Sequence, residues 1–554
     1  MLSKLLCLFL VLSFEGNLVC SSDDDLPEID TPLGRVRGFW KTSGDQKYAA
    51  FEGIPYAKPP VGDLRFEEPE PISAWSGTWE ANTLQTCLQQ EGFLGPEDVL
   101  GEDCLYLNVY VPADSVKNPK TLDVIVSIHG GGFMIGNGQM AMNMSLENIV
   151  LVSFNYRVGV LGFLSTEDNV IPGNNGMKDQ VLALKWVRDN IASFGGDPHS
   201  VTIVGGSAGG ASVHLHYFSP LSKGLFVKGV SQSGTALAPW VIRRNALQRA
   251  KKLAVLVGCP DSPSEELKKC LKQRPAQTLI NQLVHFYGVG IMPFSPFAPV
   301  VEKGSANAFL DMEPYQLLKE GKVHDVPWIT SYTTDEGLLP AGFYYKNLEE
   351  VDKTWVDIAP YLLDCNDTLP ALKKGTVAKE VLDYYLGPGE KINKKNFKKF
   401  TQIFTDRLFA VPAEVSAKMQ AKVNKSPVYV YHFNYSEGEN NAAQSYIGSE
   451  IEGVGHGEDC IYFYGIMQVK PLSEEDKRLT NACRNMLYSY ASSGNPSFDG
   501  TDTWKATGPK ELTYLLINGP DDMKLQRSER VTPIDFWSKL GLLEYDNFAV
   551  RDEL

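Results

Sequence analysis

The sequence predicts an α/β fold with a mainly parallel central sheet that carries helices on both faces. Three observations support this prediction. Apolar runs alternate with stretches of helical periodicity, strand-like hairpins precede them, and the 554-residue chain is 43% hydrophobic. Strand–helix alternation is typical of parallel sheets, because the crossover between two parallel strands usually carries a helix. A chain of this length and composition is able to bury a large core.

The N-terminal part of the chain predicts β-hairpins. Residues 35–41 and 48–54 read as strands, and turn-forming residues stand at 32–34 and 43–45. We expect these strands to form a small N-terminal sheet beside the main one.

Strands of the main sheet are predicted from short apolar runs. Residues 124–128, 149–154 and 201–204 are candidates for buried strands. Residues 180–194 carry apolar side chains at helical spacing and predict a covering helix.

Domain organisation is predicted to be simple. Residues 240–480 contain mixed helical patterns that the sequence alone does not order, and neither a repeat nor a Pro-, Gly- or Ser-rich linker interrupts the chain. We therefore expect residues 21–554 to form a single domain.

The chain is acidic, with a formal net charge of −15. Nucleic-acid binding depends on basic patches that neutralise phosphates, so this balance argues against a nucleic-acid partner. It does not identify a substrate.

Residues 1–20 predict a signal peptide. Lys4 supplies a positive charge, residues 5–14 are apolar, and small residues follow near 19–22. The apolar run is too short to span a membrane, and no later run approaches the ~18 residues that a span needs. A buried N-terminal helix is the alternative, but the polar run 21–25 leaves that helix nothing to join.

The cysteines agree with the secretory pathway. Of nine, Cys7 and Cys20 lie in or beside the signal, and pairs bound the short stretches 87–104 and 259–270. Short oxidised loops suit secretory proteins and add roughly 2–4 kcal/mol each. At least one remaining thiol should stay unoxidised. The remaining cysteines are Cys365, Cys460 and Cys483.

N-glycosylation sequons begin at Asn143, Asn366 and Asn434 and agree with the same compartment. A fourth, at Asn424, is weaker because Pro427 follows it.

Residues 205–209 read G-G-S-A-G and match the motif G-x-S-x-G, with Ser207 at its centre. The motif follows the apolar run 201–204 and precedes a helical stretch at 211–218. A sharp strand-to-helix turn exposes the serine hydroxyl, and the flanking glycines allow close backbone approach. An ordinary Gly-rich turn is the alternative. Ser207 is the candidate nucleophile.

A second glycine motif, H-G-G-G-F at 129–133, follows the strand candidate 124–128. Backbone N–H groups at Gly131 and Gly132 are able to approach a developing oxyanion, and the N–H of Ala208 supplies a third donor. A flexible glycine loop is the alternative.

His456 is the best candidate for the general base among eight histidines. It lies in the glycine-flanked loop 453–457, late in the chain, where the order serine, acid, histidine requires the base. The alternative is a loop histidine that hydrogen-bonds only to backbone. Two of the other histidines precede the serine, two lie in the helix after it, and three lie in strand-like or helical stretches. These are His129, His199, His214, His216, His285, His324 and His432.

The acid is expected at the end of the strand candidate 326–330, which runs into T-D-E-G at 334–337. A carboxylate just beyond a strand end is able to orient an imidazole. The residues themselves leave Asp335 and Glu336 as equal candidates.

Together these motifs resemble the type-B carboxylesterase and cholinesterase family. Within that family, the sequence is most similar in character to insect carboxylesterases. The resemblance spans nearly the whole mature chain, so it is specific. Further matching blocks are F-E-G-I-P-Y-A at 51–57, E-D-C-L-Y-L-N at 102–108, N-Y-R at 155–157, G-G-D-P at 195–198, Q-S-G at 232–234 and F-A-P-V-V at 297–301.

The resemblance implies the α/β-hydrolase fold and assigns roles at matching positions. It selects Glu336 as the acid and His456 as the base, and it places Ser233 near the acid. Trp240 and Phe297 match acyl-pocket positions. The implied pairs are the disulfides Cys87–Cys104 and Cys259–Cys270 and the ion pairs Arg65–Glu102 and Arg157–Asp179.

Departures from the family pattern narrow the range of expected substrates. Loop 88–103 lacks the tryptophan that holds a quaternary ammonium in cholinesterases, and Gly206 and Leu339 replace their glutamate and aromatic residues. Choline esters are therefore poor candidates. Juvenile hormone esterases typically carry glutamine at the position that matches Gly206, which makes juvenile hormone a less favoured substrate. Pro293 and Ser295 stand where two phenylalanines narrow the cholinesterase acyl pocket, so larger acyl groups than acetyl are expected.

The sequence thus favours a hydrolase of small or medium carboxylic esters, acting through an acyl-enzyme without metal or cofactor. Its expected partner is a small-molecule ester, and the sequence does not indicate an oligomeric state. One alternative is a protein that sequesters esters with slow turnover. Another is a catalytically silent adhesion protein, which the intact serine, acid and histidine disfavour.

Residues 551–554 read R-D-E-L and differ at one position from known retention signals of the endoplasmic reticulum. We expect residence in that lumen, with secretion as the alternative.

Overall fold

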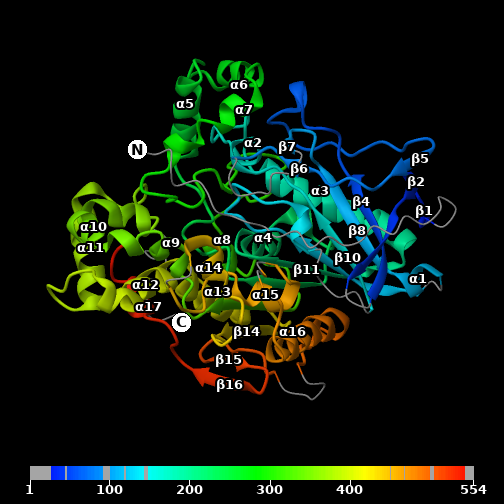
Figure 1. Ribbon diagram of the computed structural model, residues 1–554. Helices are drawn as coiled ribbons and strands as arrows, with labels where there is room; N and C mark the ends of the chain where they lie inside the picture. The colour runs from blue at the N-terminus through cyan, green and yellow to red at the C-terminus, as the bar shows by residue number, and fades with distance from the viewer. Residues whose placement is uncertain are drawn as a thin grey trace.

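The computed structural model describes residues 26–43, 46–90, 100–117, 120–141, 148–448, 451–466, 468, 470–498 and 504–542 (Figure 1). The predicted signal peptide, the Asn143 sequon and the R-D-E-L tail lie outside these residues.

A large mixed sheet dominates the fold, and its central part is parallel. Within the described residues its order is β16-β15-β14-β13-β12-β11-β9-β10-β8-β4-β3, with every pairing from β15 to β10 parallel and the outer pairings antiparallel. This arrangement confirms the predicted fold class. The strands are β3 (Phe39–Ser43), β4 (Gln46–Pro55), β8 (Tyr106–Pro112), β9 (Leu122–Ile128), β10 (Ile149–Phe154), β11 (Gly196–Gly206), β12 (Lys228–Gln232), β13 (Trp328–Thr333), β14 (Val428–Phe433), β15 (Leu512–Gly519) and β16 (Asp522–Ser528).

Helices cover both faces of this sheet, so its central strands are largely buried on both sides. Alternate residues of β9 enter different core clusters, with Val124 and Val126 in one and Ile125 in the other. Helices α3 (Asn175–Asn190) and α4 (Ala208–His216) contribute to the first cluster, and α16 (Glu474–Ser493) contributes to the second (Figure 1). Every residue of β10 and β13 is buried as a result.

One predicted strand is wrong in its extent. Residues 35–41 form two strands, β2 (Gly34–Arg37) and β3, which separate at Gly38 and join different sheets. A Cβ at Gly38 would lie 2.3 Å from the carbonyl oxygen of Ala50, so glycine allows the crossing. β2 joins the small sheet with β1 (Glu28–Thr31) and β5 (Thr78–Glu80), whereas the β3–β4 hairpin extends the large sheet.

The other predicted elements correspond to observed ones. The runs 124–128 and 149–154 fall in β9 and β10, the run 201–204 is the core of the longer β11, and 180–194 covers most of α3 and the 3₁₀ turn after it.

Helices predominate between residues 240 and 480, where the sequence pattern was not interpretable. Helices α5 to α7 group at the top of Figure 1, and α10 and α11 lie at its left. The remaining elements are α1 (Ala113–Lys117), α2 (Gly159–Phe163), α5 (Ala246–Leu256), α6 (Ser264–Lys272), α7 (Ala276–Ile280), α8 (Pro314–Lys319), α9 (Leu338–Gly342), α10 (Leu348–Leu362), α11 (Ala371–Leu386), α12 (Phe397–Thr405), the π-helix η9 (Asp406–Ala410), α13 (Val411–Val423), α14 (Ala442–Ile447), α15 (Glu458–Tyr464), α17 (Ile534–Trp537), β6 (Thr86–Cys87) and β7 (Leu100–Gly101). Across the described ranges, none of the helices is long and apolar enough to cross a membrane.

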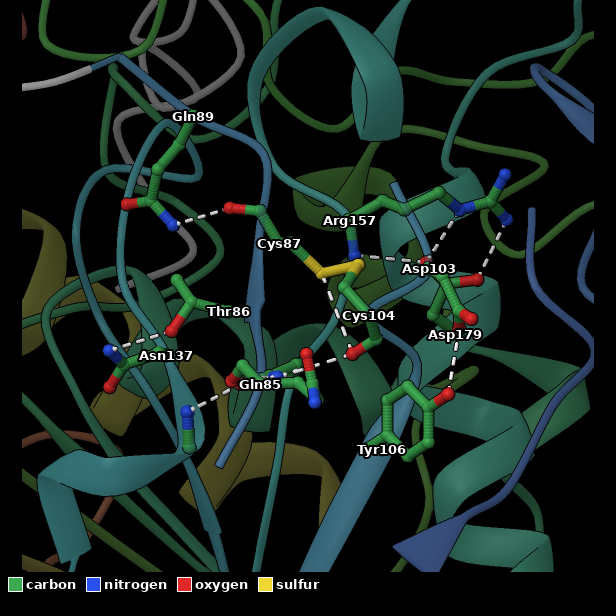
Figure 2. The surroundings of a disulfide bond; sticks show 12 residues. Gln85, Thr86, Cys87, Gln89, Asp103, Cys104, Tyr106, Asn137, Arg157 and Asp179 are labelled. Carbon is green, nitrogen blue, oxygen red and sulfur yellow. Dashed lines mark hydrogen bonds and ion pairs between the residues drawn. A yellow bond between two sulfur atoms is a disulfide. The ribbon is translucent and has the colours of Figure 1, made fainter. Parts of the chain in front are cut away.

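Both expected disulfides, Cys87–Cys104 and Cys259–Cys270, are present. Figure 2 shows the first, and beside it Gln89, whose amide nitrogen donates to Cys87 O at 2.9 Å. The same amide exchanges hydrogen bonds of 2.9 and 2.8 Å with the backbone of Gly136. The Gln89 side chain therefore links the disulfide-bonded Cys87 to the segment that follows the H-G-G-G motif.

The two ion pairs implied by the resemblance are also present. Arg65 and Glu102 form two hydrogen bonds of 2.6 Å, and Arg157 contacts Asp179 at 2.7 and 2.8 Å. The Arg157–Asp179 contacts appear in Figure 2.

Candidate active site

Ser207 lies at the sharp turn between β11 and α4. Its φ of 59° and ψ of −125° are uncommon for a residue with a side chain, and such conformations concentrate at functional sites. The turn requires glycine on both sides. A Cβ at Gly205 would lie 2.5 Å from the carbonyl carbon of Gly209, and a Cβ at Gly209 would lie 2.1 Å from Ile128 O. The serine side chain stays partly exposed, which fits a nucleophile.

The H-G-G-G loop leaves the carboxyl end of β9 and packs directly against this turn. A Cβ at Gly130 would lie 2.7 Å from Gly206 O and 3.2 Å from the Cβ of Ser207. Gly131 and Gly132 have φ angles of 102° and 62°, which favour glycine. Ala208 is the first residue of α4, so its N–H has no partner within the helix.

His129 is the first residue of the same loop, and its contacts are those of a buried structural residue. Its ring stacks on Tyr156 at 4.2 Å between centroids, and burial lowers its pKa to about 4. Tyr156 OH also donates to His129 O at 3.0 Å, which fixes the loop at its start.

Glu336 and His456 are in direct contact. Glu336 Oε2 lies 2.5 Å from His456 Nδ1, and Glu336 is fully buried. The other carboxylate oxygen accepts hydrogen bonds from Ser233 Oγ at 2.5 Å and from Thr333 N at 2.8 Å. Of the two adjacent acids that the residues left open, Glu336 is the one that faces the imidazole. Asp335 turns to the backbone of Val454 instead.

The carboxyl ends of three parallel strands bring these groups to one edge of the sheet. β11 leads into Ser207, β12 into Ser233, and β13 toward Glu336. A Cβ at Gly234 would lie 2.1 Å from Ser207 O, so the Ser233 segment stands between Ser207 and Glu336. In open α/β sheets this edge is where ligands bind.

A chain of aromatic contacts leads to the His456 ring from one side. Trp240, 2% exposed, lies 6.3 Å from Phe133 and 5.9 Å from Phe409 between ring centroids. Phe409 in turn lies 4.8 Å from the His456 ring. Leu408 O accepts from Trp240 Nε1 at 3.0 Å. Phe409 had no sequence signal, because it belongs to the π-helix η9 inside the stretch that the sequence did not order.

The segment 293–302 borders the glycine loop from another side. A Cβ at Gly132 would lie 3.3 Å from Phe294 O and 3.6 Å from Ser295 Oγ, and Ser295 is fully buried. Phe297 packs on Phe286, with ring centroids 4.9 Å apart.

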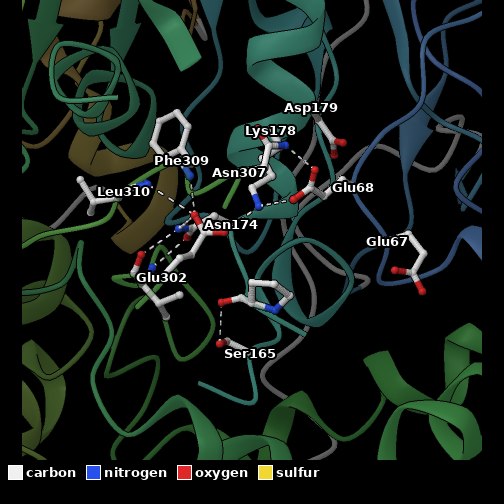
Figure 3. A network of polar contacts seen from close by, with 12 residues as sticks. Glu67, Glu68, Ser165, Asn174, Lys178, Asp179, Glu302, Asn307, Phe309 and Leu310 are labelled. Carbon is white, nitrogen blue, oxygen red and sulfur yellow. Dashed lines mark hydrogen bonds and ion pairs between the residues drawn. The ribbon is translucent and has the colours of Figure 1, made fainter. Parts of the chain in front are cut away.

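A buried polar network anchors the end of this segment to α3 (Figure 3). Lys178 pairs with Glu302 at 2.7 Å and with Glu68 at 2.7 Å. Asn174 donates to Glu302 at 3.0 Å and to Val300 O at 2.7 Å. Because Asn174, Lys178 and Glu302 are buried and paired, the segment has a defined path past the glycine loop.

The histidines of α4 are buried and turned into the core. His214 contacts Gln420 at 2.9 Å, and His216 contacts Ser222 at 2.7 Å and Gln180 at 3.0 Å. Burial lowers the pKa of each to about 3. Within the described ranges, no group of three or more His, Cys, Asp or Glu side chains is arranged to hold a metal ion.

Comparisons with known proteins agree on one family. The sequence model of the carboxylesterase family matches residues 25–537. Venom carboxylesterase-6 of Apis mellifera is 38% identical over 537 residues, which cover 94% of this chain and 96% of that protein. Esterase FE4 of Myzus persicae is 38% identical over 518 residues, 90% of each chain. The crystal structure of juvenile hormone esterase from Manduca sexta, with OTFP covalently attached, is 27% identical. It superimposes with a TM-score of 0.81, covering 93% of this chain and 100% of that one.

Proposed function

Because the chain belongs to the carboxylesterase family and is an ester hydrolase, we propose which residues catalyse the hydrolysis. The proposed catalytic residues are Ser207, His456 and Glu336. The observation that carries the proposal is the 2.5 Å contact between Glu336 Oε2 and His456 Nδ1, at the sheet edge where the Ser207 turn also lies.

In the proposed first half-reaction, Ser207 Oγ attacks the ester carbonyl while His456 Nε2 accepts the serine proton. The carboxylate of Glu336 holds the Nδ1–H of His456 and stabilises the imidazolium. Negative charge develops on the carbonyl oxygen, and the N–H groups of Gly131, Gly132 and Ala208 stabilise it.

The tetrahedral intermediate then expels the alcohol, which takes its proton from His456, and leaves an acyl group on Ser207. In the second half-reaction His456 removes a proton from water, and the resulting attack releases the carboxylic acid. The juvenile hormone esterase of Manduca sexta carries covalently attached OTFP, which supports a covalent step in the proposed mechanism.

Ser207→Ala tests this assignment. The variant should fold, because only a hydroxyl is removed from a partly exposed side chain. Turnover of a nitrophenyl ester should fall by ~10⁴-fold or more, and the burst of nitrophenol that reports acylation should vanish. Near-normal turnover would show that Ser207 is not the nucleophile. In the wild-type enzyme, the burst amplitude compared with the steady rate also separates turnover from slow sequestration.

The proposed substrates are small or medium esters with acyl groups larger than acetyl. Ser295 is small and buried beside Gly132, where a bulkier side chain would narrow the space. Butyryl and longer esters should therefore be accepted, and a steep preference for acetyl esters would contradict the proposal. Ser295→Phe should shift the preference toward acetyl.

We also propose residence in the secretory pathway, with glycans at the sequons. The two disulfides support this compartment. Asn366 and Asn434 are half-buried, so neither is enclosed in the core. Asn434 Nδ2 donates to Asn518 at 2.8 Å, and a glycan there would leave one amide hydrogen for that contact.

A further inference from the structure

Asp335, beside the proposed acid, reaches the loop that carries the proposed base. Its Oδ2 accepts a hydrogen bond from Val454 N at 3.1 Å, and its own N–H donates to Val454 O at 2.9 Å. Asp335 is 6% exposed, so water competes little for either contact. Residues 335 and 336 thus bind residues 454 and 456, respectively.

The loop 453–457 depends on such ties because of its glycines. Gly453 and Gly457 have φ angles of 148° and 84°, and glycine loses more conformational freedom on ordering than other residues. A Cβ at Gly453 would lie 2.9 Å from Asp335 Oδ2, so the loop closes tightly over this carboxylate.

Other contacts hold the two ends of the loop. Asn441 Nδ2 donates to Gly453 O at 2.7 Å, and Glu458 accepts from Ala442 N at 2.7 Å. These contacts fix the loop to α14. Asp335 differs from them because it fixes the loop to the segment that presents Glu336.

We infer that Asp335 is a positioning residue for the proposed reaction, whose carboxylate holds Val454 so that His456 Nδ1 stays in contact with Glu336. The inference rests on the proposed roles of His456 and Glu336. Its physical basis is that a displacement of about 1 Å in a catalytic group is able to cost ~10²-fold in rate. Burial raises the pKa of Asp335, while the Val454 N–H and Lys398 act in the opposite direction. The hydrogen bond therefore helps to keep this carboxylate ionised in the interior.

Substitutions that keep or remove the acceptor test the inference. In Asp335→Ala the acceptor is lost, and kcat should fall about 10–100-fold while KM changes by about twofold or less. In Asp335→Asn the amide oxygen still accepts from Val454 N, so kcat should stay within about threefold of wild type. Equal losses in both variants would overturn the inference, as would an alanine variant with wild-type kcat. If the alanine variant does not fold, Asp335→Ser replaces it, because its shorter hydroxyl does not reach Val454.

Asp325 provides a control of the same residue type at an exposed position far from the proposed site, before β13 begins. Its Oδ1 accepts from Lys425 N at 3.0 Å and from Ser426 N at 2.8 Å, just before β13 and β14 begin. Asp325→Ala should lower the melting temperature without changing kcat. A loss of kcat in this control similar to that of Asp335→Ala would attribute both effects to general destabilisation and would overturn the inference.

A double-mutant cycle with Glu336→Gln distinguishes positioning from an independent role. If Asp335 acts by aligning His456 on Glu336, then Asp335→Ala should add less than about threefold to the loss caused by Glu336→Gln. Fully multiplicative losses would overturn the inference. Ser207→Ala tests the proposed function separately. An inactive Ser207→Ala together with a fully active Asp335→Ala would refute only the positioning role.

Discussion

A Cβ atom at Gly206 would lie 3.0 Å from the Sγ of Cys460, closer than most carbon–sulfur contacts. Gly206 immediately precedes Ser207, and Cys460 lies in α15, directly after the His456 loop. The residue before the proposed nucleophile therefore packs against the helix that follows the proposed base. Any side chain at position 206 must displace one of these two segments or the thiol.

Gly206→Gln should lower kcat/KM about 10-fold or more, because the new side chain meets the buried Cys460. Overpacking of this kind costs ~1–3 kcal/mol, and part of that cost should appear as a shift of Ser207 or His456. Adding Cys460→Ala removes the obstructing sulfur and should restore much of the loss. The measurement is hydrolysis of a nitrophenyl butyrate by the single and double variants, with Cys460→Ala alone as the reference. A double variant no better than Gly206→Gln would show that this contact does not restrict position 206.

Gly132→Val should reduce hydrolysis by ~10²–10³-fold, the usual cost of losing one oxyanion donor. The φ of 62° disfavours a β-branched residue, and the new Cβ would lie 3.3 Å from Phe294 O. Steady-state kinetics with a nitrophenyl ester measure the effect.

Gly62→Val is the matched control for backbone strain. Gly62 has a φ of 57°, and a Cβ there would meet no atom within 4 Å. This variant should lose some stability and keep its kcat. If Gly62→Val were active and Gly132→Val equally active, the glycine loop would not form the oxyanion site.

Local patterns were sufficient to predict β9 and β10, because both strands are largely buried on both faces and consist mostly of apolar residues. The break at Gly38 was not predictable in the same way. It depends on the close approach of Ala50, a residue on the next strand, and a single sequence does not show which strands pair. The order of strands in the sheet depends on such distant contacts throughout.

The proposed nucleophile and base were predictable because each has glycines at fixed offsets. The acid was not, since Asp335 and Glu336 are neighbours on one turn and only the backbone path decides which carboxylate faces His456. The family resemblance selected Glu336, whose carboxylate contacts His456. The carboxylate of Asp335 binds the backbone of Val454 instead. Phe409 was missed because the π-helix η9 changes the helical register that sequence periodicity reports.

Stability should fall as the pH drops below about 6.5, in part because of the buried histidines of α4. The pKa of His216 is lowered by burial to about 3, whereas an unfolded histidine has a pKa of about 6.5. Between these two values the unfolded chain binds more protons than the folded one, so acid favours unfolding. Above pH 6.5 neither state is protonated at this position, and its contribution no longer changes with pH.

His216→Gln removes this titration. It should reduce the pH dependence of the unfolding free energy by at most ~1.4 kcal/mol per pH unit. The variant should be less stable at pH 7.5, because it alters the contacts with Ser222 and Gln180. Urea unfolding at pH 7.5, 6.5 and 5.5 measures the slope. The control is His199→Gln, a histidine substitution at an exposed position outside α4. A parallel decline in His216→Gln and wild type would refute the assignment.

Removal of residues 551–554 should release the protein into the medium of expressing cells. The tail R-D-E-L keeps a cationic first residue, two carboxylates and a terminal leucine, the features that known retention signals share. The full-length chain should stay inside the cell with immature glycans, and the truncated chain should be secreted. Replacing the last four residues by K-D-E-L gives a positive control for retention in the same cells. Equal secretion of the full-length and truncated chains would refute retention and leave the esterase assignment unaffected, because the tail follows the last residue of the family match at 537.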